Sequence, residues 1–289
     1  MTTTEFEIPF PESSDRHLKI SVGACHLIIH PGEDAPWVKG SYIDPAGILP
    51  IKVNTVGGET RLTQELSPIE LSGGFQGLTT LDLALGKGRP YWLTIESGAS
   101  EVQIDLGGLP ISRLYVREGA SRYALTFSAP NPQPLVLFSL SVGAGVVEVR
   151  NLANANLVEM VMEGGAATYR LDFGEQLQRE ALVRIATGMA LVEIALPEAI
   201  AAKIATDKTI GNVQAAESLV NLEGSYWTPA AINGKTPLLD MRVNLSIGTL
   251  RLFLGPEQNV LSEPPPVHGA DSSPDGPPAV ESLVDRVEI

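Results

Sequence analysis

Three stretches of the sequence repeat one pattern: FSLSVGAGVVEV at residues 138–149, MVMEGGAATYRL at 160–171 and VRIATGMALVEI at 183–194. In each stretch, apolar residues alternate with other residues on both sides of a central glycine. Alternate side chains of a β-strand point to opposite faces, so the pattern predicts two short strands, each with one apolar face. The glycine between them predicts a tight bend that passes close to neighbouring backbone.

The same pattern recurs along most of the chain. In every copy, the residues five and three before the glycine, and four and six after it, are apolar or tyrosine. The central glycines are Gly23, Gly98, Gly119, Gly143, Gly165, Gly188 and Gly248. From Gly98 to Gly188 they are 21 to 24 residues apart, which is the length of one solenoid coil. We therefore predict an all-β fold, a single-chain β-helix (β-solenoid), with Val147, Tyr169 and Val192 stacked in consecutive parallel layers.

The outward positions of the coils support this stacking. Glu148, Arg170 and Glu193 occupy one outward position in consecutive coils, and Glu101 and Arg122 share another. Opposite charges therefore become neighbours, where like charges would be unfavourable. A β-sandwich is the alternative all-β fold, but its hairpins favour two-residue turns, whereas these units end in longer connections rich in proline and glycine.

The repeat sets the expected domain boundaries. We predict an N-terminal extension at residues 1–14, a β-solenoid domain at 15–254 and a Pro-rich acidic disordered tail at 255–289. A weaker unit surrounds Gly74, so the N-terminal part of the solenoid is expected to be irregular. The tail has seven prolines and seven acidic residues but one arginine, a composition that favours disorder.

Two segments outside the repeat are candidate partner-binding sites. In the last ten residues, apolar side chains fall at helical spacing, which predicts a short helix ordered by a partner; a solvated tail end is the alternative. These side chains are Val280, Leu283, Val284 and Val287. Residues 214–239 interrupt the period and carry Tyr226 and Trp227. They predict either a binding loop with an aromatic anchor or a cap over the last coil.

Composition excludes several classes of partner. The chain has 289 residues, 44% of them hydrophobic, with a formal net charge of -14 and a pI near 4.7. This charge repels nucleic-acid phosphates and anionic lipid surfaces, so we expect neither as a partner. The apolar runs are too short for membrane insertion, and the acidic N-terminal residues do not resemble a secretory signal, so we expect a cytoplasmic protein. Cys25 is the single cysteine, which excludes an intramolecular disulfide.

The order of segments after the repeat resembles a known family. Leu196-Pro197-Glu198 is followed by KIAT at residues 203–206, IGNV at 210–213 and VNLSIGTL at 243–250. This order resembles bacterial toast-rack and putative-adhesin domains, and it is similar to the C-terminal region of cell-wall-active-antibiotics response proteins. The resemblance covers roughly residues 93–254. It implies a β-solenoid, and it carries no catalytic residue over to this chain.

The sequence contains no convincing catalytic or metal-binding motif. His26 and His30 would lie about 13–14 Å apart along one strand, too far to share a metal. We expect them and His17 to be exposed, and we expect no metal or cofactor. The glycine-rich stretches lack the ending of a phosphate loop, and the outward positions do not gather the carboxylates of a sugar lyase.

These observations predict a non-enzymatic structural or scaffold protein with a protein partner. Because a solenoid has open strand edges at its ends, self-assembly into a homo-oligomer is the leading hypothesis. One alternative is a protein-binding regulatory module of an envelope-stress-like response that uses its C-terminal tail. A carbohydrate-active enzyme is the less favoured alternative.

Overall fold

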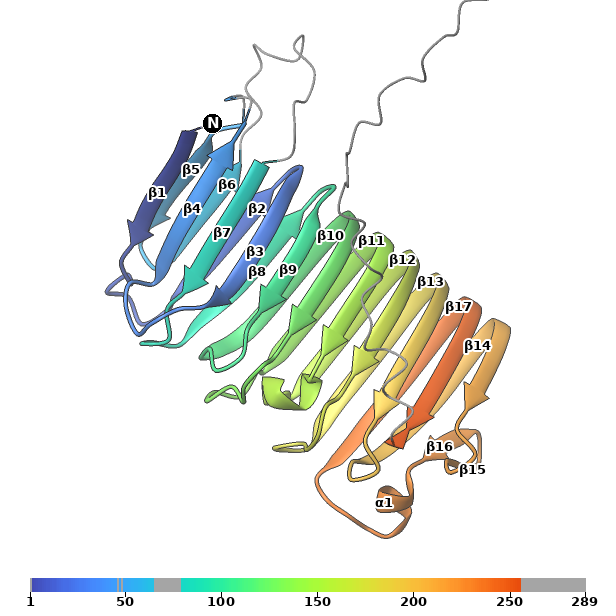
Figure 1. Ribbon diagram of the computed structural model, residues 1–289. Helices are drawn as coiled ribbons and strands as arrows, with labels where there is room; N and C mark the ends of the chain where they lie inside the picture. The colour runs from blue at the N-terminus through green and yellow to red at the C-terminus, as the bar shows by residue number, and fades with distance from the viewer. Residues whose placement is uncertain (1, 46, 48, 65–78, 256–289) are drawn as a thin grey trace, which may run out of the picture.

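The protein is described by a computed structural model that covers residues 2–45, 47, 49–64 and 79–255. Its long strands lie side by side as a rack (Figure 1). Each strand runs through a bend, and we call each bent unit a rung. The halves before the bends form the first layer, and the halves after the bends form the second. The long strands are β10 (Ile111–Thr126), β11 (Leu137–Arg150), β12 (Glu159–Asp172), β13 (Ala181–Leu196), β14 (Ala201–Ala215) and β17 (Leu238–Leu254).

The predicted parallel stacking is confirmed. Val147 pairs with Tyr169, and Tyr169 pairs with Val192, in parallel neighbouring strands. The strands from β10 to β13 pair in parallel through both layers without a change of register between their halves. The fold is therefore a β-solenoid rather than a sandwich of antiparallel hairpins.

Nearer the N-terminus, each rung consists of separate strands. The unit around Gly23 stacks directly on the unit around Gly98, although 75 residues separate the two glycines. In the first layer, β2 lies between β6 and β8; in the second, β3 lies between β7 and β9. These strands are β2 (His17–Val22), β3 (Cys25–Pro31), β6 (Glu59–Gln64), β7 (Thr79–Leu85), β8 (Tyr91–Ser97) and β9 (Glu101–Asp105).

The N-terminal end of the rack is irregular, as predicted, because its outer strands are antiparallel. In the second layer, β4 (Val38–Asp44) pairs with β7, and β1 (Thr2–Ile8) pairs with β4. In the first layer, β5 (Ile51–Val56) pairs with β6. Thus β1, which lies in the segment set apart as an extension, is a strand of the sheet. The weaker unit at Gly74 lies outside the described residues.

The core lies between the two layers, and the alternating apolar residues fill it. At one position of the first layer, the stacked side chains are Leu18, Leu93, Leu114, Phe138, Met160, Val183 and Met241. All of them are fully buried. Complete burial of one large apolar side chain contributes about 1.5–3 kcal/mol, so repeating rows of this kind dominate the favourable energy of the fold.

The outward charge pattern is also confirmed. Arg170 lies between Glu148 and Glu193 in adjacent strands. Its Nε lies 3.1 Å from Glu193 Oε2, and Arg251 Nη1 lies 3.0 Å from the other oxygen of Glu193. Glu101 and Arg122 are likewise paired positions.

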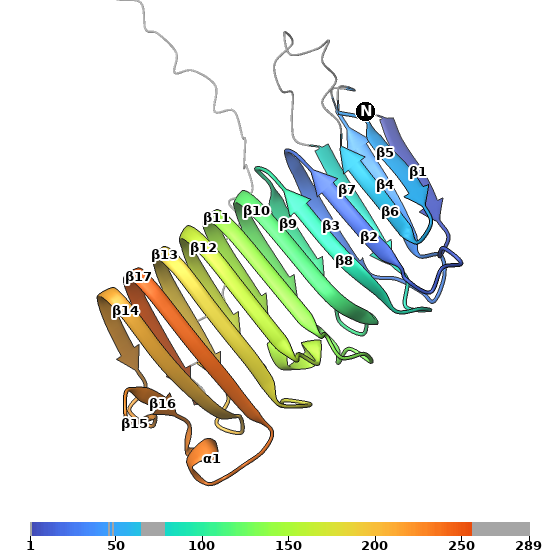
Figure 2. The same ribbon diagram turned by 180° about the vertical axis from the view of Figure 1, so that it is seen from behind.

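The last rungs differ from the predicted order. β17 lies between β13 and β14, so β14 forms the C-terminal end of the stack (Figures 1 and 2). The predicted alignment of Gly248 with Gly188 is wrong by two residues, because Gly248 pairs with Ala190. A shift of two leaves every side chain on the same face, which explains why the apolar positions of this unit are buried as expected.

Several bends require glycine because consecutive backbones approach closely there. A Cβ atom on Gly119 would lie 2.5 Å from Gly98 O, and one on Gly143 would lie 2.6 Å from Gly119 O. Ala120 N donates to the same Gly98 O at 2.9 Å. A side chain at the bend would therefore separate two rungs that are otherwise hydrogen-bonded along their length.

The remaining elements are short. They are η1 (Leu152–Ala155), β15 (Val220–Leu222), β16 (Ser225–Trp227) and α1 (Pro229–Ile232). Neither helix has the length or apolar character to span a bilayer, and this statement covers only the described part of the chain.

We predict that Gly143→Ala lowers the free energy of unfolding by about 1–3 kcal/mol, because the new methyl group collides with backbone that cannot move without parting two rungs. Gly23→Ala is the matched control, since its Cβ would meet Gln64 Oε1 at an ordinary 3.6 Å. Urea unfolding of both variants measures the difference. Equal stability of the two variants would contradict the proposed role of the close approach.

Candidate functional site

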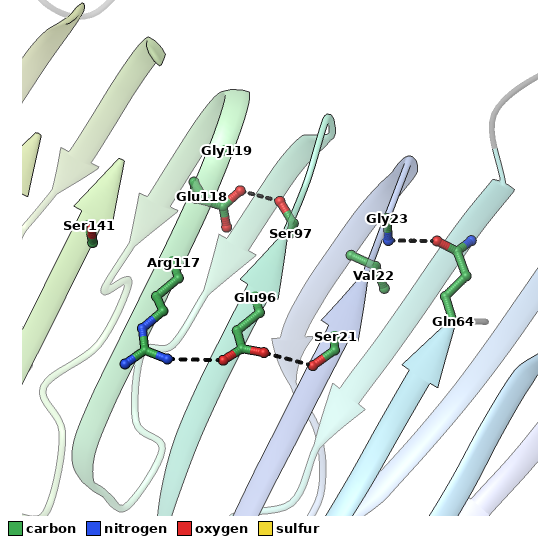
Figure 3. A pocket seen from close by; sticks show the side chains of 10 residues that line it. All are labelled: Ser21, Val22, Gly23, Gln64, Glu96, Ser97, Arg117, Glu118, Gly119 and Ser141. Atoms are coloured by element: carbon green, nitrogen blue, oxygen red, sulfur yellow. Dashed lines mark hydrogen bonds and ion pairs between the residues drawn. The ribbon is translucent and has the colours of Figure 1, made fainter. Parts of the chain in front are cut away.

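A pocket of about 540 Å³ opens beside the row of bends, and we call it the bend pocket (Figure 3). Strands β2, β6, β8, β10 and β11 contribute to it, so it depends on rungs that are distant in sequence. Its lining residues are Ser21, Val22, Gly23, Gln64, Glu96, Ser97, Arg117, Glu118, Gly119 and Ser141.

Hydrogen bonds and ion pairs connect the outer part of the bend pocket. Glu96 accepts hydrogen bonds from Ser21 Oγ at 3.1 Å and from Arg117 Nη1 at 3.3 Å, and it pairs with Lys19 Nζ at 2.8 Å. Burial alone would raise the pKa of Glu96, but Lys19, assisted by Ser21 and Arg117, lowers it overall. Gln64 Oε1 accepts from Gly23 N at 2.8 Å. In this part of the site, one carboxylate therefore interacts with two cations and a hydroxyl group.

Glu118 lies deeper and is chemically different. It occupies an inward position between Ser97 and Val142 of the adjacent rungs, and its side chain is 5% exposed. Ser97 Oγ donates to Glu118 Oε2, whereas Oε1 has no hydrogen-bond partner among the described residues. Burial raises the pKa of Glu118 to about 7, although Ser97 and Ser121 oppose the rise.

Tyr123 adds to this buried polar cluster. Its hydroxyl is buried, and within the described residues it has no hydrogen-bond partner. Burial raises the pKa of Tyr123, and the charge of Glu118 raises it further. The cluster therefore favours neutral side chains, and Glu118 can hold or release a proton near neutral pH.

Glu118 is not among the residues that the repeat pattern marks as candidates. The available signal was positional: it precedes a central glycine, where alternation predicts an inward side chain, and Val22 and Val142 hold the equivalent places. Ser97, Gly164 and Thr187 also belong to this row, so Glu118 differs from its equivalents by its charge, and a charged group at an inward position often marks a functional site.

The predicted aromatic pair lies at the C-terminal end of the rack. β16 pairs antiparallel with the first half of β14, which sets Trp227 opposite Lys203 and Tyr226 opposite Ile204. Both aromatic side chains are half-buried, and Lys203 Nζ lies 5.3 Å from the centre of the Trp227 ring. The hairpin therefore covers part of an edge strand, while the choice between cap and binding loop remains a prediction.

Thr228 fixes this hairpin to the rack. Its buried Oγ1 donates to Ile200 O at 2.8 Å and accepts from Ala202 N at 2.9 Å. It also accepts from Ala231 N at 3.3 Å, which caps α1. One side chain thus connects β14, the hairpin and the short helix.

The other predicted residues are not brought together. The tail residues Val280, Leu283, Val284 and Val287 lie outside the described part of the chain. His17 is in the first layer, where its Nε2 lies 2.8 Å from Thr94 Oγ1, whereas His26 and His30 are in the second. Across residues 2–64 and 79–255, apart from the undescribed positions 46 and 48, no group of three or more His, Cys, Asp or Glu residues could hold a metal ion.

We predict that Glu118→Gln removes a pH dependence of stability. The unfolded carboxyl, with a pKa near 4.5, loses its proton before the folded one does, so wild-type stability falls from about pH 4.5 to about pH 7. Above pH 7 the variant should be more stable than the wild type by about 3 kcal/mol. Urea unfolding at pH 5 and pH 8 tests this, and parallel pH profiles of the two proteins would refute it.

We also predict that Trp227→Ala destabilises the protein by about 1–3 kcal/mol or causes new self-association, because it weakens the cover over β14. Leu222→Ala, at a side chain that is 46% exposed in the same hairpin, is the control. Thermal unfolding and light scattering distinguish the alternatives. Unchanged stability and unchanged mass would favour the binding loop over the cap.

A family comparison confirms the toast-rack resemblance, but the match covers the N-terminal half of the chain and not residues 196–250, which suggested it. The family described as the N-terminal domain of toast_rack, DUF2154, matches residues 2–150, a range that includes every residue of the bend pocket. No curated protein matches the chain. One solved structure, a "putative cell adhesion protein" from Clostridium sporogenes, is 16% identical, with a TM-score of 0.46 over 88% of this chain and 99% of the other. Because the family match spans more than half of the 289 residues, the chain belongs to the family of the toast-rack N-terminal domain.

Proposed function

We propose that this protein is a non-enzymatic scaffold that assembles with copies of itself through the end of its rack. Membership of the toast-rack family supports a structural or binding role. The observation that carries the proposal of self-assembly is the incomplete cover of β14, the outermost strand at the C-terminal end.

The uncovered part of β14 is a potential pairing surface. Its first half pairs with β16 at residues 203–205. In the second half, residues 210–215 pair with β17 on one side, and no described strand pairs with them on the other. We call this segment the free edge. Unpaired backbone donors and acceptors of an edge strand readily accept another strand.

An apolar ridge lies next to the free edge. Met189, Ile247 and Ile210 occupy one aligned position in the paired strands β13, β17 and β14. Their side chains are 61%, 44% and 62% exposed, respectively. The equivalent position is alanine in β10, β11 and β12. Exposed apolar groups in one row favour association because contact removes them from water.

The alternative functions have less support from the described residues. A regulatory module that acts through its tail depends on residues 280–289, which lie outside the described part of the chain. The expected cytoplasmic location also remains a prediction.

We predict that the molar mass of the full chain increases with concentration. Sedimentation velocity and light scattering across the micromolar range should show a reversible increase, because strand pairing at an edge follows mass action. A strict monomer at every concentration would overturn the proposal of self-assembly.

A further inference from the structure

The free edge presents two chemically different faces. Val213 and Ala215 are on the core side, since they pair with the buried Leu250 and Leu252 of β17 and pack against the core. Asn212 alternates with them on the outer face. Within the described part of the chain, the core is therefore incompletely closed at this end, because its last apolar side chains have a neighbouring strand on one side only.

The free edge also lacks charge. Residues 210–215 read IGNVQA, with no acidic or basic side chain, in a chain whose formal net charge is -14. Two copies of such a protein repel each other over most of their surface, so contact is least unfavourable where charge is absent. By contrast, self-pairing of β1 would bring Glu5 and Glu7 near their equivalents, and like charges on paired strands are destabilising.

We propose that two copies of this chain pair antiparallel along their free edges, about a two-fold axis at Val213. This inference rests on the proposed self-assembly and specifies its interface. The pairing sets Asn212 opposite Gln214 of the second copy twice, so the amides can exchange hydrogen bonds. It also sets Val213 opposite its own equivalent on the core side, which makes the apolar cores of the two racks continuous.

The position of the hairpin is compatible with this arrangement. β15, β16 and α1 gather at the end of β14 that lies away from the bends (Figures 1 and 2). Antiparallel pairing reverses the second copy, so the two hairpins lie at opposite ends of the shared edge. Because the same surface of both copies is used, the association closes as a dimer instead of extending into a filament.

The first test uses a charge on the axis. Val213→Lys in the full chain would place two lysines directly opposite each other, and it should weaken dimerisation at least tenfold in sedimentation velocity. Val53→Lys, at a 44% exposed side chain of β5 at the opposite end, is the matched control and should leave the dimer unchanged.

A second test can support or overturn the proposed interface even if the Val213→Lys variant does not fold. Opposite residues of antiparallel strands have Cα atoms about 4.5–5.5 Å apart, which suits a disulfide. Val213→Cys should therefore form an oxidised dimer on a non-reducing gel, whereas Val53→Cys should not. Cys25 is buried, so it should not contribute to cross-linking.

The outcomes separate the two proposals. Cross-linking of Val213→Cys together with a discrete wild-type dimer supports the two-fold interface. Open-ended polymers, or an assembly that Val53→Lys disrupts and Val213→Lys does not, overturns that interface and leaves the proposed self-assembly standing. A monomer at every concentration overturns both.

Discussion

The close approach of successive backbones at the bends is the constraint on which the rest of this structure depends. At the bends of the central rungs, the missing side chain of a glycine lets the neighbouring carbonyl oxygen approach, as at Gly119 and Gly143. If the bends were held farther apart, the parallel hydrogen bonds on both sides of them could not form together. The glycines therefore keep both layers in one register, and that register stacks the apolar side chains into continuous rows.

Stacking explains both the strength of the rack and its vulnerable ends. An inner rung has neighbours on both sides for its backbone and for its apolar side chains, and it needs no specialised closure. A terminal rung lacks one neighbour, so it requires a cover. The N-terminal end is covered by antiparallel strands, with the acidic β1 outermost in the second layer. At the C-terminal end, the cover that the described residues provide is the β16 hairpin, which pairs with the first half of β14.

The charged groups have two distinct roles. Alternating charges such as Arg170 and Glu193 occupy the outward positions, where Arg170 is partly exposed and Glu193, paired with both Arg170 and Arg251, is only 6% exposed. These charged pairs are consistent with the register of the strands, but they do not determine it by themselves. Glu118 instead points inward, where burial raises its pKa to about 7. Its environment combines a bend, two neighbouring rungs and the buried Tyr123, so its protonation is linked to the stability of the stack.

The sequence by itself determined the repeat, the bend positions and the inward face of each strand. Few other structures are compatible with apolar residues that alternate with a period of two at a constant distance from a glycine. Tertiary structure alone decided which rungs are neighbours, as when β17 inserts between β13 and β14 and the Gly23 unit joins the Gly98 unit. It also decided the partners of Glu118 and the free edge of β14. The physical reason is that alternation records whether a side chain faces the core, which is a local property. Which strand lies next to which depends on contacts between distant segments. Because the rungs are chemically similar, their sequences do not specify the order in which they stack.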